Sequence, residues 1–295
     1  MSSVASSPAA MVAALKAFDR LGLLGGGQSA VWTGTDQIQT NWINEVYGPL
    51  SGLVGGIPEI VVNATIIPAE HVAFLAEHGW QAQITEGSPE DVFTAGILDA
   101  LVKWLTKGQV GWTSAVNGNR YPSFTLGREG LTCRSSSAFE GDTFFEVRTQ
   151  NGDIVRLVET RSAPSDWVEL AQMCREAVRR RQSASEIHGV DGVRIPMVDL
   201  SVSEELAQLV GMRTQGRWYV ARACQQARLR MNEEGARAQA AVEMLITRGG
   251  GDDRNILTID QPFIVELVRH VGQLEVPLFQ AFVDYDAWKA PADLG

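Results

Sequence analysis

Two stretches near the C-terminal end alternate between apolar and polar residues, and they constrain the fold more than any other feature. In residues 217–231, RWYVARACQQARLRM, apolar side chains fall on one face and most of the arginines and glutamines on the other. This period of two predicts a long strand buried on one face. In residues 236–247 the even positions hold Ala, Ala, Ala, Val, Met and Ile. A polar turn, residues 232–235, separates the stretches, and we expect its glycine to supply backbone freedom.

The second stretch is compatible with two local structures. Its alternation fits a strand buried on one face, but its sequence ARAQAAVEML also has high helix propensity. We therefore keep two states open, a strand within a sheet and a helix or mobile loop outside it. The run TRGGGDDRN that follows contains three consecutive glycines. This run predicts an exposed loop tip that a protease can reach.

The rest of the chain mixes helical and strand patterns without an internal repeat, which predicts the α+β fold class. Helices are predicted over 8–24, 69–78, 88–107, 164–182 and 203–212, and strands over 59–67, 80–85 and 193–202. The segment 88–107 has the clearest amphipathic helical pattern, and the strand 59–67 is expected to be buried on both faces. Short strands are expected over 110–160, with Asn151-Gly152 forming a hairpin turn.

Composition and motifs exclude several classes of function. A net charge of −10 argues against a general nucleic-acid-binding protein. The sequence has no apolar run of the about 18 residues that a membrane helix needs. The histidines and cysteines have no metal-ligand or disulfide spacing, and no nucleophile or phosphate-binding motif occurs. We therefore expect no metal, no cofactor and no enzymatic activity. Without an evident signal peptide, cytoplasmic localisation is the default expectation, and secretion stays open.

The stretch NEEGARAQAA, residues 232–241, resembles the hinge of the serpin family, in which acidic residues and a glycine precede small residues. Pro262-Phe263 follows Gly235 at a distance that suits a serpin reactive-centre loop, and residues 259–284 resemble the closing strands of the family. Ser7-Pro8 opens an early helix, as in serpins. The resemblance implies one serpin-like domain over residues 1–295. It would have a central β-sheet, flanking helices and an exposed reactive-centre loop at about residues 233–258.

The resemblance also implies a function, namely suicide inhibition of a serine protease through loop cleavage and strand insertion. The hinge residues that it assigns are Glu233, Glu234, Gly235, Ala236, Ala238, Ala240 and Ala241. Family spacing puts the scissile bond between Arg248 and Gly249, and an arginine there implies a trypsin-like protease partner. Arg254 is the next candidate, and cleavage after Met244 or Leu245 would leave a shorter inserting strand.

Several departures from the family keep a second function open. Ser7 fits the family's gate for strand opening, but Ala10 replaces the second serine and Gln225 the histidine. The chain is shorter than a typical serpin, and the family's lysine-tryptophan strand ending is not recognised between about residues 115 and 190. The alternative is therefore a non-inhibitory serpin-fold binding or structural protein. We interpret Arg179-Arg180-Arg181 as a solvated helix end, so polyanion binding is not expected.

Overall fold

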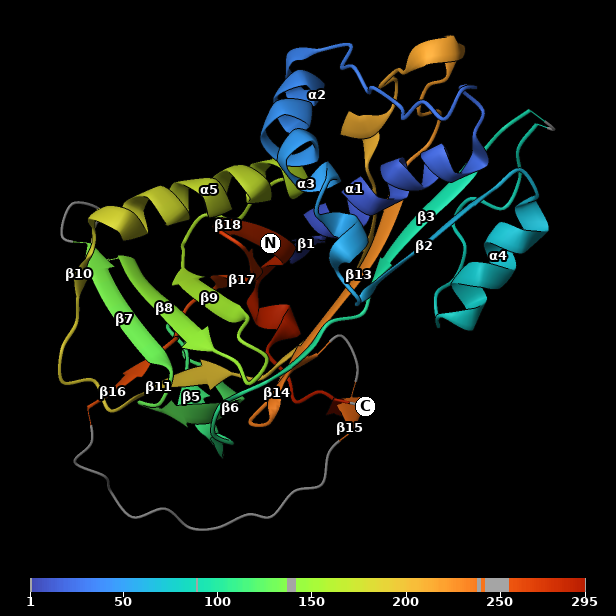
Figure 1. Ribbon diagram of the computed structural model, residues 1–295. Coiled ribbons are helices and arrows are strands. Elements are labelled where there is room, and N and C mark those ends of the chain that lie inside the picture. The colour runs from blue at the N-terminus through green and yellow to red at the C-terminus, as the bar shows by residue number, and fades with distance from the viewer. Residues whose placement is uncertain (1, 89, 137–141, 238–239, 242–254, 295) are drawn as a thin grey trace. The chain divides into compact units, whose positions relative to one another are not determined.

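The computed structural model describes residues 2–88, 90–136, 142–237, 240–241 and 255–294, and it contains two units (Figure 1). Unit 1 consists of Met1–Ser6, Ala100–Val202 and Ala227–Gly295, and unit 2 of Ser7–Asp99 and Ser203–Gln226. Strands β12 (Val198–Glu205) and β13 (Cys224–Met231) have residues in both units. That the whole chain is one domain stays a prediction.

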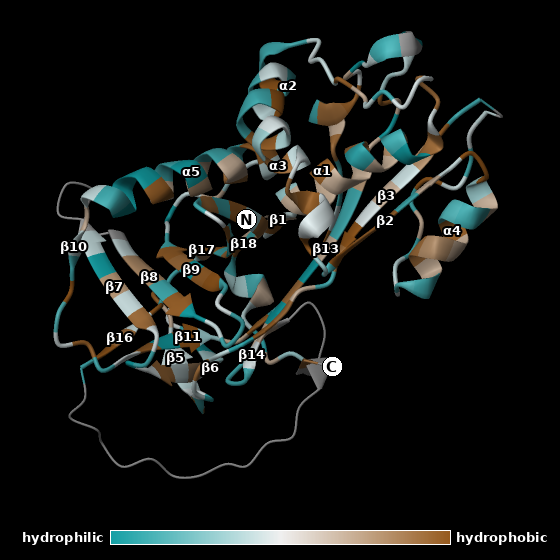
Figure 2. Cartoon of the chain, viewed as in Figure 1, coloured by the Kyte–Doolittle hydropathy of each residue, from teal (hydrophilic) through white to brown (hydrophobic). Residues whose placement is uncertain are grey.

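Unit 1 is built mainly from strands around a seven-stranded sheet, whose order is β1-β18-β17-β9-β8-β7-β10. These strands are β1 (Val4–Ser6), β7 (Leu131–Ser136), β8 (Asp142–Arg148), β9 (Ile154–Glu159), β10 (Ser185–Glu186), β17 (Phe263–Val271) and β18 (Leu274–Val283). Helix α5 (Trp167–Ser183) contacts β1, β7 and β18, and its mainly hydrophilic residues are teal in Figure 2. Its first turn buries Trp167, Leu170 and Ala171, so α5 covers the sheet with a narrow apolar stripe. This helix confirms the prediction for 164–182.

Two further four-stranded sheets complete unit 1, together with a short pair formed by β15 (Ala240–Ala241) and β19 (Asp293–Leu294). One sheet has the order β16-β11-β6-β5. Its strands are β5 (Gln109–Ser114), β6 (Arg120–Gly127), β11 (Gly192–Pro196) and β16 (Ile256–Thr258). The other has the order β12-β13-β14-β4 and adds β4 (Leu101–Lys103) and β14 (Gly235–Arg237). The strands predicted over 110–160 are therefore present. The Asn151-Gly152 hairpin turn is also confirmed, because Gly152 has a φ of 86° between β8 and β9.

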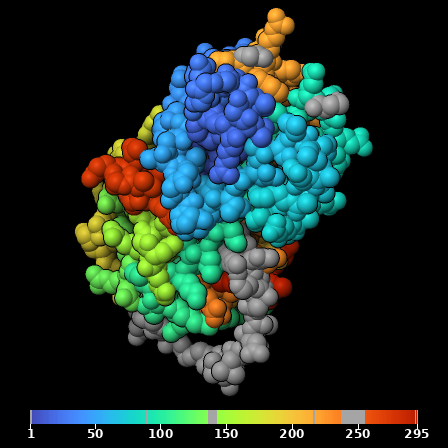
Figure 3. Space-filling view, turned by 45° about the vertical axis from the view of Figure 1, so that its right-hand side comes forward, coloured from blue at the N-terminus to red at the C-terminus, as the bar shows by residue number. Residues whose placement is uncertain are grey.

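Unit 2 packs helix α1 (Pro8–Ala17) on a pair of antiparallel strands, β2 (Ile60–Thr65) and β3 (Phe93–Leu98). The approach is close, because a Cβ at Gly96 would lie 2.2 Å from the carbonyl oxygen of Ala10. The other helices of this unit are α2 (Gln37–Trp42), α3 (Gly48–Ser51) and α4 (Pro68–Glu77). The cyan residues of α4 form part of the molecular surface in Figure 3, and its most buried residue is His71. This helix confirms the prediction for 69–78.

The helix predicted over 88–107 is wrong, because this segment contains strands β3 and β4. Residues 93–98 alternate between buried and partly buried positions, as a strand pairing with β2 requires. Gly96 is the decisive residue, since only a side chain without a Cβ allows α1 to lie so near. Tertiary packing has thus overridden a helical pattern of apolar residues.

Other predictions need smaller corrections. Residues 80–88 form no strand, and the segment predicted as a helix over 203–212 holds the end of β12 and a short 3-10 turn, Ala207–Leu209. Strand β2 is an edge strand with mostly half-buried residues, so it is not buried on both faces. The first helix ends at residue 17 and continues only as a 3-10 turn to Leu21, because Gly22 adopts a left-handed cap. Likewise, only residues 224–231 of the long strand predicted over 217–231 are in strand conformation.

Candidate functional site

Strand β14 lies between two partners, β13 and β4, and pairs antiparallel with both. Ala236 lies opposite Met231 on β13 and opposite Val102 on β4. Its side chain is buried in the interior of unit 1. Gly235 and Ala236 of the predicted hinge therefore belong to a central strand of a sheet, and a strand is one of the two states that the sequence left open.

Gly235 is required at the start of β14 by a close approach of the two backbones. A Cβ at this position would lie 2.1 Å from the carbonyl oxygen of Val102, which is far inside van der Waals contact. Gly235 is not among the glycines of positive φ. The backbone freedom of this glycine is therefore not used for a left-handed dihedral angle, and the close approach of β4 is what excludes a side chain.

The turn before β14 is held by the segment that follows β4. The indole Nε1 of Trp104 donates to the carbonyl oxygen of Asn232 at 2.8 Å, and the Gly108 amide donates to the carbonyl oxygen of Glu233 at 2.7 Å. The Trp104 amide also donates to the Glu234 carbonyl oxygen, at 3.2 Å. Trp104 is 2% exposed and stacks on Phe124. These bonds fix the hinge turn to β4, so we call residues 104–108 the hinge clasp.

Lys107 adds an electrostatic contact to the hinge clasp. Its Nζ lies 2.7 Å from Oε1 of Glu234 and 3.7 Å from Oε1 of Glu233. The hydrogen bond to Glu234 is the main cause that raises the pKa of Lys107. The Glu233 side chain is only 9% exposed, whereas those of Lys107 and Glu234 are open to solvent. Lys107 therefore supplies an opposite charge to a carboxylate that is mostly withdrawn from water.

Sequence analysis missed both Trp104 and Lys107. The signal was present, because Lys103-Trp104 is a lysine-tryptophan pair at the end of strand β4. It was expected between residues 115 and 190 but lies earlier in the chain, in the segment that had been assigned to a helix.

The later hinge residues Ala240 and Ala241 pair with a different strand from β13 and β4. Ala240 and Ala241 pair with Leu294 and Asp293 of β19. In the described residues, only Gly235–Arg237 of the loop belong to the sheet with β13 and β4. Ala238, the scissile pair Arg248-Gly249, and the alternatives Met244, Leu245 and Arg254 lie outside the residues that the structure describes.

The two predicted gate residues are in contact within unit 2. The Ser7 amide donates to Oε1 of Gln225 at 2.9 Å, and the Ser7 hydroxyl oxygen accepts from the Ala10 amide at 3.2 Å. Ser7 thereby caps α1 as well as contacting the first residues of β13. The structure brings the pair together, and its role as a gate stays a proposal.

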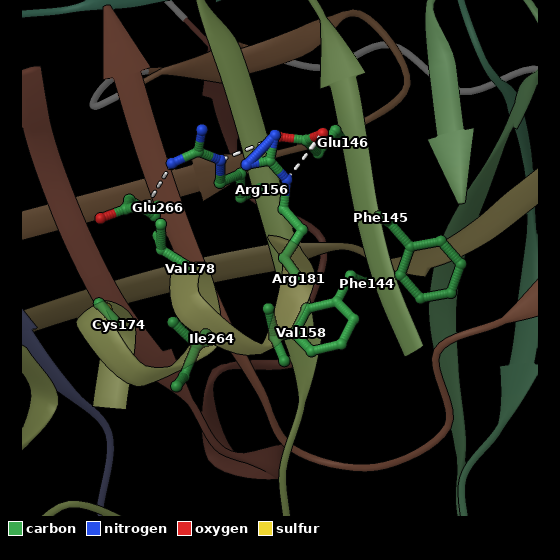
Figure 4. A pocket seen from close by; sticks show the side chains of 11 residues that line it. Phe144, Phe145, Glu146, Arg156, Val158, Cys174, Val178, Arg181, Ile264 and Glu266 are labelled. Atoms are coloured by element: carbon green, nitrogen blue, oxygen red, sulfur yellow. Dashed lines mark hydrogen bonds and ion pairs between the residues drawn. The ribbon is translucent and has the colours of Figure 1, made fainter. Parts of the chain in front are cut away.

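A small cavity lies beneath α5 and is lined by apolar residues and by an ionic network (Figure 4). Arg156 lies 2.9 Å from Glu146, 3.2 Å from Glu266 and 2.5 Å from Glu275. Burial raises the pKa of Glu266, and Arg156 opposes that shift. The cavity volume of about 20 Å³ suits about one water molecule. We interpret the network as internal charge compensation and not as a ligand site.

The arginine run at the end of α5 is paired with carboxylates. Arg179 and Arg180 contact Glu176, and Arg181 lies 3.1 Å from Glu146. This pairing supports the interpretation as a helix end.

Among the described residues, no group of acidic, histidine or cysteine side chains suits a metal ion, and no helix has the length and apolar character to span a membrane.

Comparison with known proteins shows the fold. No protein-family model and no curated protein sequence matches the chain. Among solved structures, the mouse protein Z-dependent protease inhibitor matches with a TM-score of 0.57 at 12% identity, over 96% of this chain and 91% of the inhibitor. Serpin48 of the insect Tenebrio molitor matches with a TM-score of 0.53 at 13% identity, over 96% and 92%. Thyroxine-binding globulin in complex with thyroxine matches with a TM-score of 0.54 at 11% identity, over 95% and 92%.

These matches extend over nearly the whole chain. The chain therefore has the serpin fold, an α+β architecture, as the resemblance in the sequence implied. The similar structures include a protease inhibitor and a hormone-binding globulin, so the fold is compatible with both kinds of function.

Proposed function

We propose that this chain is a serpin-type suicide inhibitor of a trypsin-like serine protease. The observation that carries the proposal is the position of β14 between β13 and β4, in register with both. A strand that has begun to insert needs only to extend in the same direction. The residues after β14 are those whose sequence alternates between small and polar side chains.

Continuing the register of β14 along β13 tests whether the loop fits the sheet. Ala238 would then lie opposite Leu229, and Ala240 opposite Ala227. Leu229 and Ala227 are both buried on the face that also contains Met231. Small side chains at alternate positions would therefore enter the apolar side of the sheet with little steric cost.

The covalent step of the proposal is transfer of the Arg248 acyl group to the protease. The protease serine attacks the Arg248 carbonyl carbon, the peptide bond to Gly249 breaks, and the protease histidine passes the serine proton to the departing Gly249 amine. An ester then joins Arg248 to the protease. Insertion of residues 236–248 beside β13 would carry the ester-linked protease along and trap it before water cleaves the ester.

The test is incubation of the protein with trypsin, followed by denaturing gel electrophoresis and a thermal melt. We expect a covalent complex that survives denaturant, and a cut protein that melts at a much higher temperature than the intact one. Arg248→Gln should abolish the complex, whereas the matched control Arg254→Gln should retain it. Cleavage at Arg248 without a complex and without a rise in melting temperature would contradict the proposal.

The pairing of Ala240–Ala241 with β19 favours a second function. In this arrangement Ala240 and Ala241 belong to a two-stranded sheet with residues 293–294 and not to the sheet of β13 and β4. A non-inhibitory binding or structural protein would keep this pairing after cleavage. Its cut form would gain no strand and would show no increase in thermal stability.

A further inference from the structure

Strand β16 anchors the C-terminal side of the proposed reactive loop, and its own pairing is limited. It consists of Ile256–Thr258 and, among the residues that the structure describes, lies at the edge of its sheet, where it pairs in parallel with β11. Pairing over three residues at the edge of a sheet stabilises a strand only weakly. The contacts on either side of β16 therefore decide how firmly this end of the loop is fixed.

The contacts on its C-terminal side involve the connection to β17. The Ile259 amide donates to the carbonyl oxygen of Arg194 at 2.9 Å, and the Asp260 carbonyl oxygen accepts from the Val116 amide at 2.8 Å. The Asp260 amide donates to Oε1 of Glu159 at 3.0 Å. Glu159 is the last residue of β9, so its carboxylate links the connection to the centre of the seven-stranded sheet.

Glu159 lies in an environment that opposes its negative charge. The backbone amide of Asp260 donates to the Glu159 carboxylate, but the side-chain carboxylate of Asp260 repels it. Tyr285 interacts electrostatically with both carboxylates, and its own surroundings also include Asp284 and Tyr121 on β6. Arg161, which follows β9, donates to Oε1 of Gln261 at 3.3 Å. No ion pair of Glu159 occurs within the described part of the chain.

Together, the surroundings of Glu159 stabilise its protonated, neutral form more than water does. Burial is the largest cause, and with Asp260 it raises the pKa of Glu159 to about 7, although hydrogen bonds from the Asp260 and Gln261 amides oppose the shift. When the connection opens and Glu159 meets water, its pKa returns toward about 4.3. Because the closed arrangement binds the proton more tightly than the open one, linkage requires that loss of the proton favours opening.

We propose that Glu159 and Asp260 form a proton-operated anchor for β16. The anchor holds the C-terminal end of the loop when Glu159 is neutral and loosens when Glu159 is ionised. A role of this anchor in protease inhibition rests on the proposed function, whereas the anchor itself is independent of that function.

Hydrogen exchange on the uncut protein, without any protease, tests the anchor separately from inhibition. After correction for the intrinsic exchange rate, the amides of residues 256–261 should lose about tenfold of their protection between about pH 6 and about pH 8. Glu159→Gln should keep high protection at both pH values, because the amide imitates the neutral acid. Asp260→Asn should weaken the pH dependence, because it removes the facing charge.

Glu169→Gln is the matched control, because the Glu169 carboxylate also accepts a backbone amide, from Ser165, but lies in the open. It should leave the wild-type pH dependence unchanged. Equal protection of the wild type at both pH values would overturn the proposal, as would an undiminished pH dependence in Glu159→Gln. If that variant does not fold, a carbon-13 titration of the wild-type Glu159 carboxyl decides the matter. A midpoint near about 7 supports the anchor, and one near about 4.3 contradicts it.

Discussion

Ala236 lies directly opposite Met231 in the register of β14 and β13, and the two side chains are 6% and 0% exposed. The pair marks the point at which the loop segment enters the sheet. The proposed insertion would repeat the same arrangement two residues further on, so every inward position must be apolar, and the first three, Ala236, Ala238 and Ala240, are also small.

Ala236→Arg should therefore block insertion. A guanidinium at this buried position would lose its hydration, and its desolvation would oppose both β14 and any longer strand. We expect the variant to change from inhibitor to substrate, so that trypsin cleaves it without leaving a stable complex. The ratio of complex to cleaved product on a denaturing gel measures this change. Ala73→Arg, on the exposed side of α4, is the control and should inhibit as the wild type does.

Lys107→Ala should loosen the hinge turn. The exposed contact with Glu234 contributes little, but removal of Lys107 also leaves the mostly buried Glu233 without its opposite charge. We expect a loss of about 0.5–1 kcal/mol in the free energy of unfolding, measured by urea denaturation. The loss should shrink at about 1 M salt, where the screening length is short. Lys289→Ala, at another exposed lysine, should change neither value. A salt-independent loss would contradict an electrostatic role for Lys107.

A strand after Gly235 was one of the two local structures that the sequence predicted, whereas part of the scaffold around it was predicted wrongly. Hinge and loop have a local signature, since the Asn232–Gly235 turn and the small residues after it can be recognised one by one. Strands β3 and β4 lack such a signature. Phe93, Ile97 and Trp104 also fit a helical stripe, whereas the contacts that accompany the strand, such as the pairing of β3 with β2 and the approach of α1 to Gly96, are long-range.

The hinge clasp was missed for a related reason. Trp104 and Asn232 are bonded in the fold but are 128 positions apart in the chain. A single sequence contains nothing that pairs them. Ser7 and Gln225 are still farther apart in the chain, at 218 positions, and they were paired only because the serpin resemblance implied a gate.

His71 should make unit 2 less stable in acid. Burial lowers the pKa of its imidazole, and its ring packs against Phe93 with a centroid separation of 5.4 Å. The unfolded chain therefore binds a proton first as the pH falls, so stability is retained above about pH 6.5 and is lost below it. His71→Leu should reduce the fall in melting temperature between about pH 7.5 and about pH 5.5. His188→Gln, at an exposed histidine, should retain the wild-type fall.

Gly235→Ala should disturb the start of β14. The new methyl group would lie 2.1 Å from the carbonyl oxygen of Val102 and 3.1 Å from the Cα of Lys103, so one of the two backbones has to move. Neither atom belongs to a flexible side chain, and overpacking of this kind costs about 1–3 kcal/mol.

The expected result is a lower urea midpoint together with faster hydrogen exchange at Ala236, because the displaced strand loses its pairing with Val102. Gly52→Ala is the matched control. It also adds one methyl group to a glycine without positive φ, but there the methyl group meets no atom within 4 Å. We expect Gly52→Ala to be neutral or slightly stabilising through the unfolded chain. Equal effects of the two substitutions would show that loss of backbone freedom, and not the approach of β4, explains the glycine at position 235.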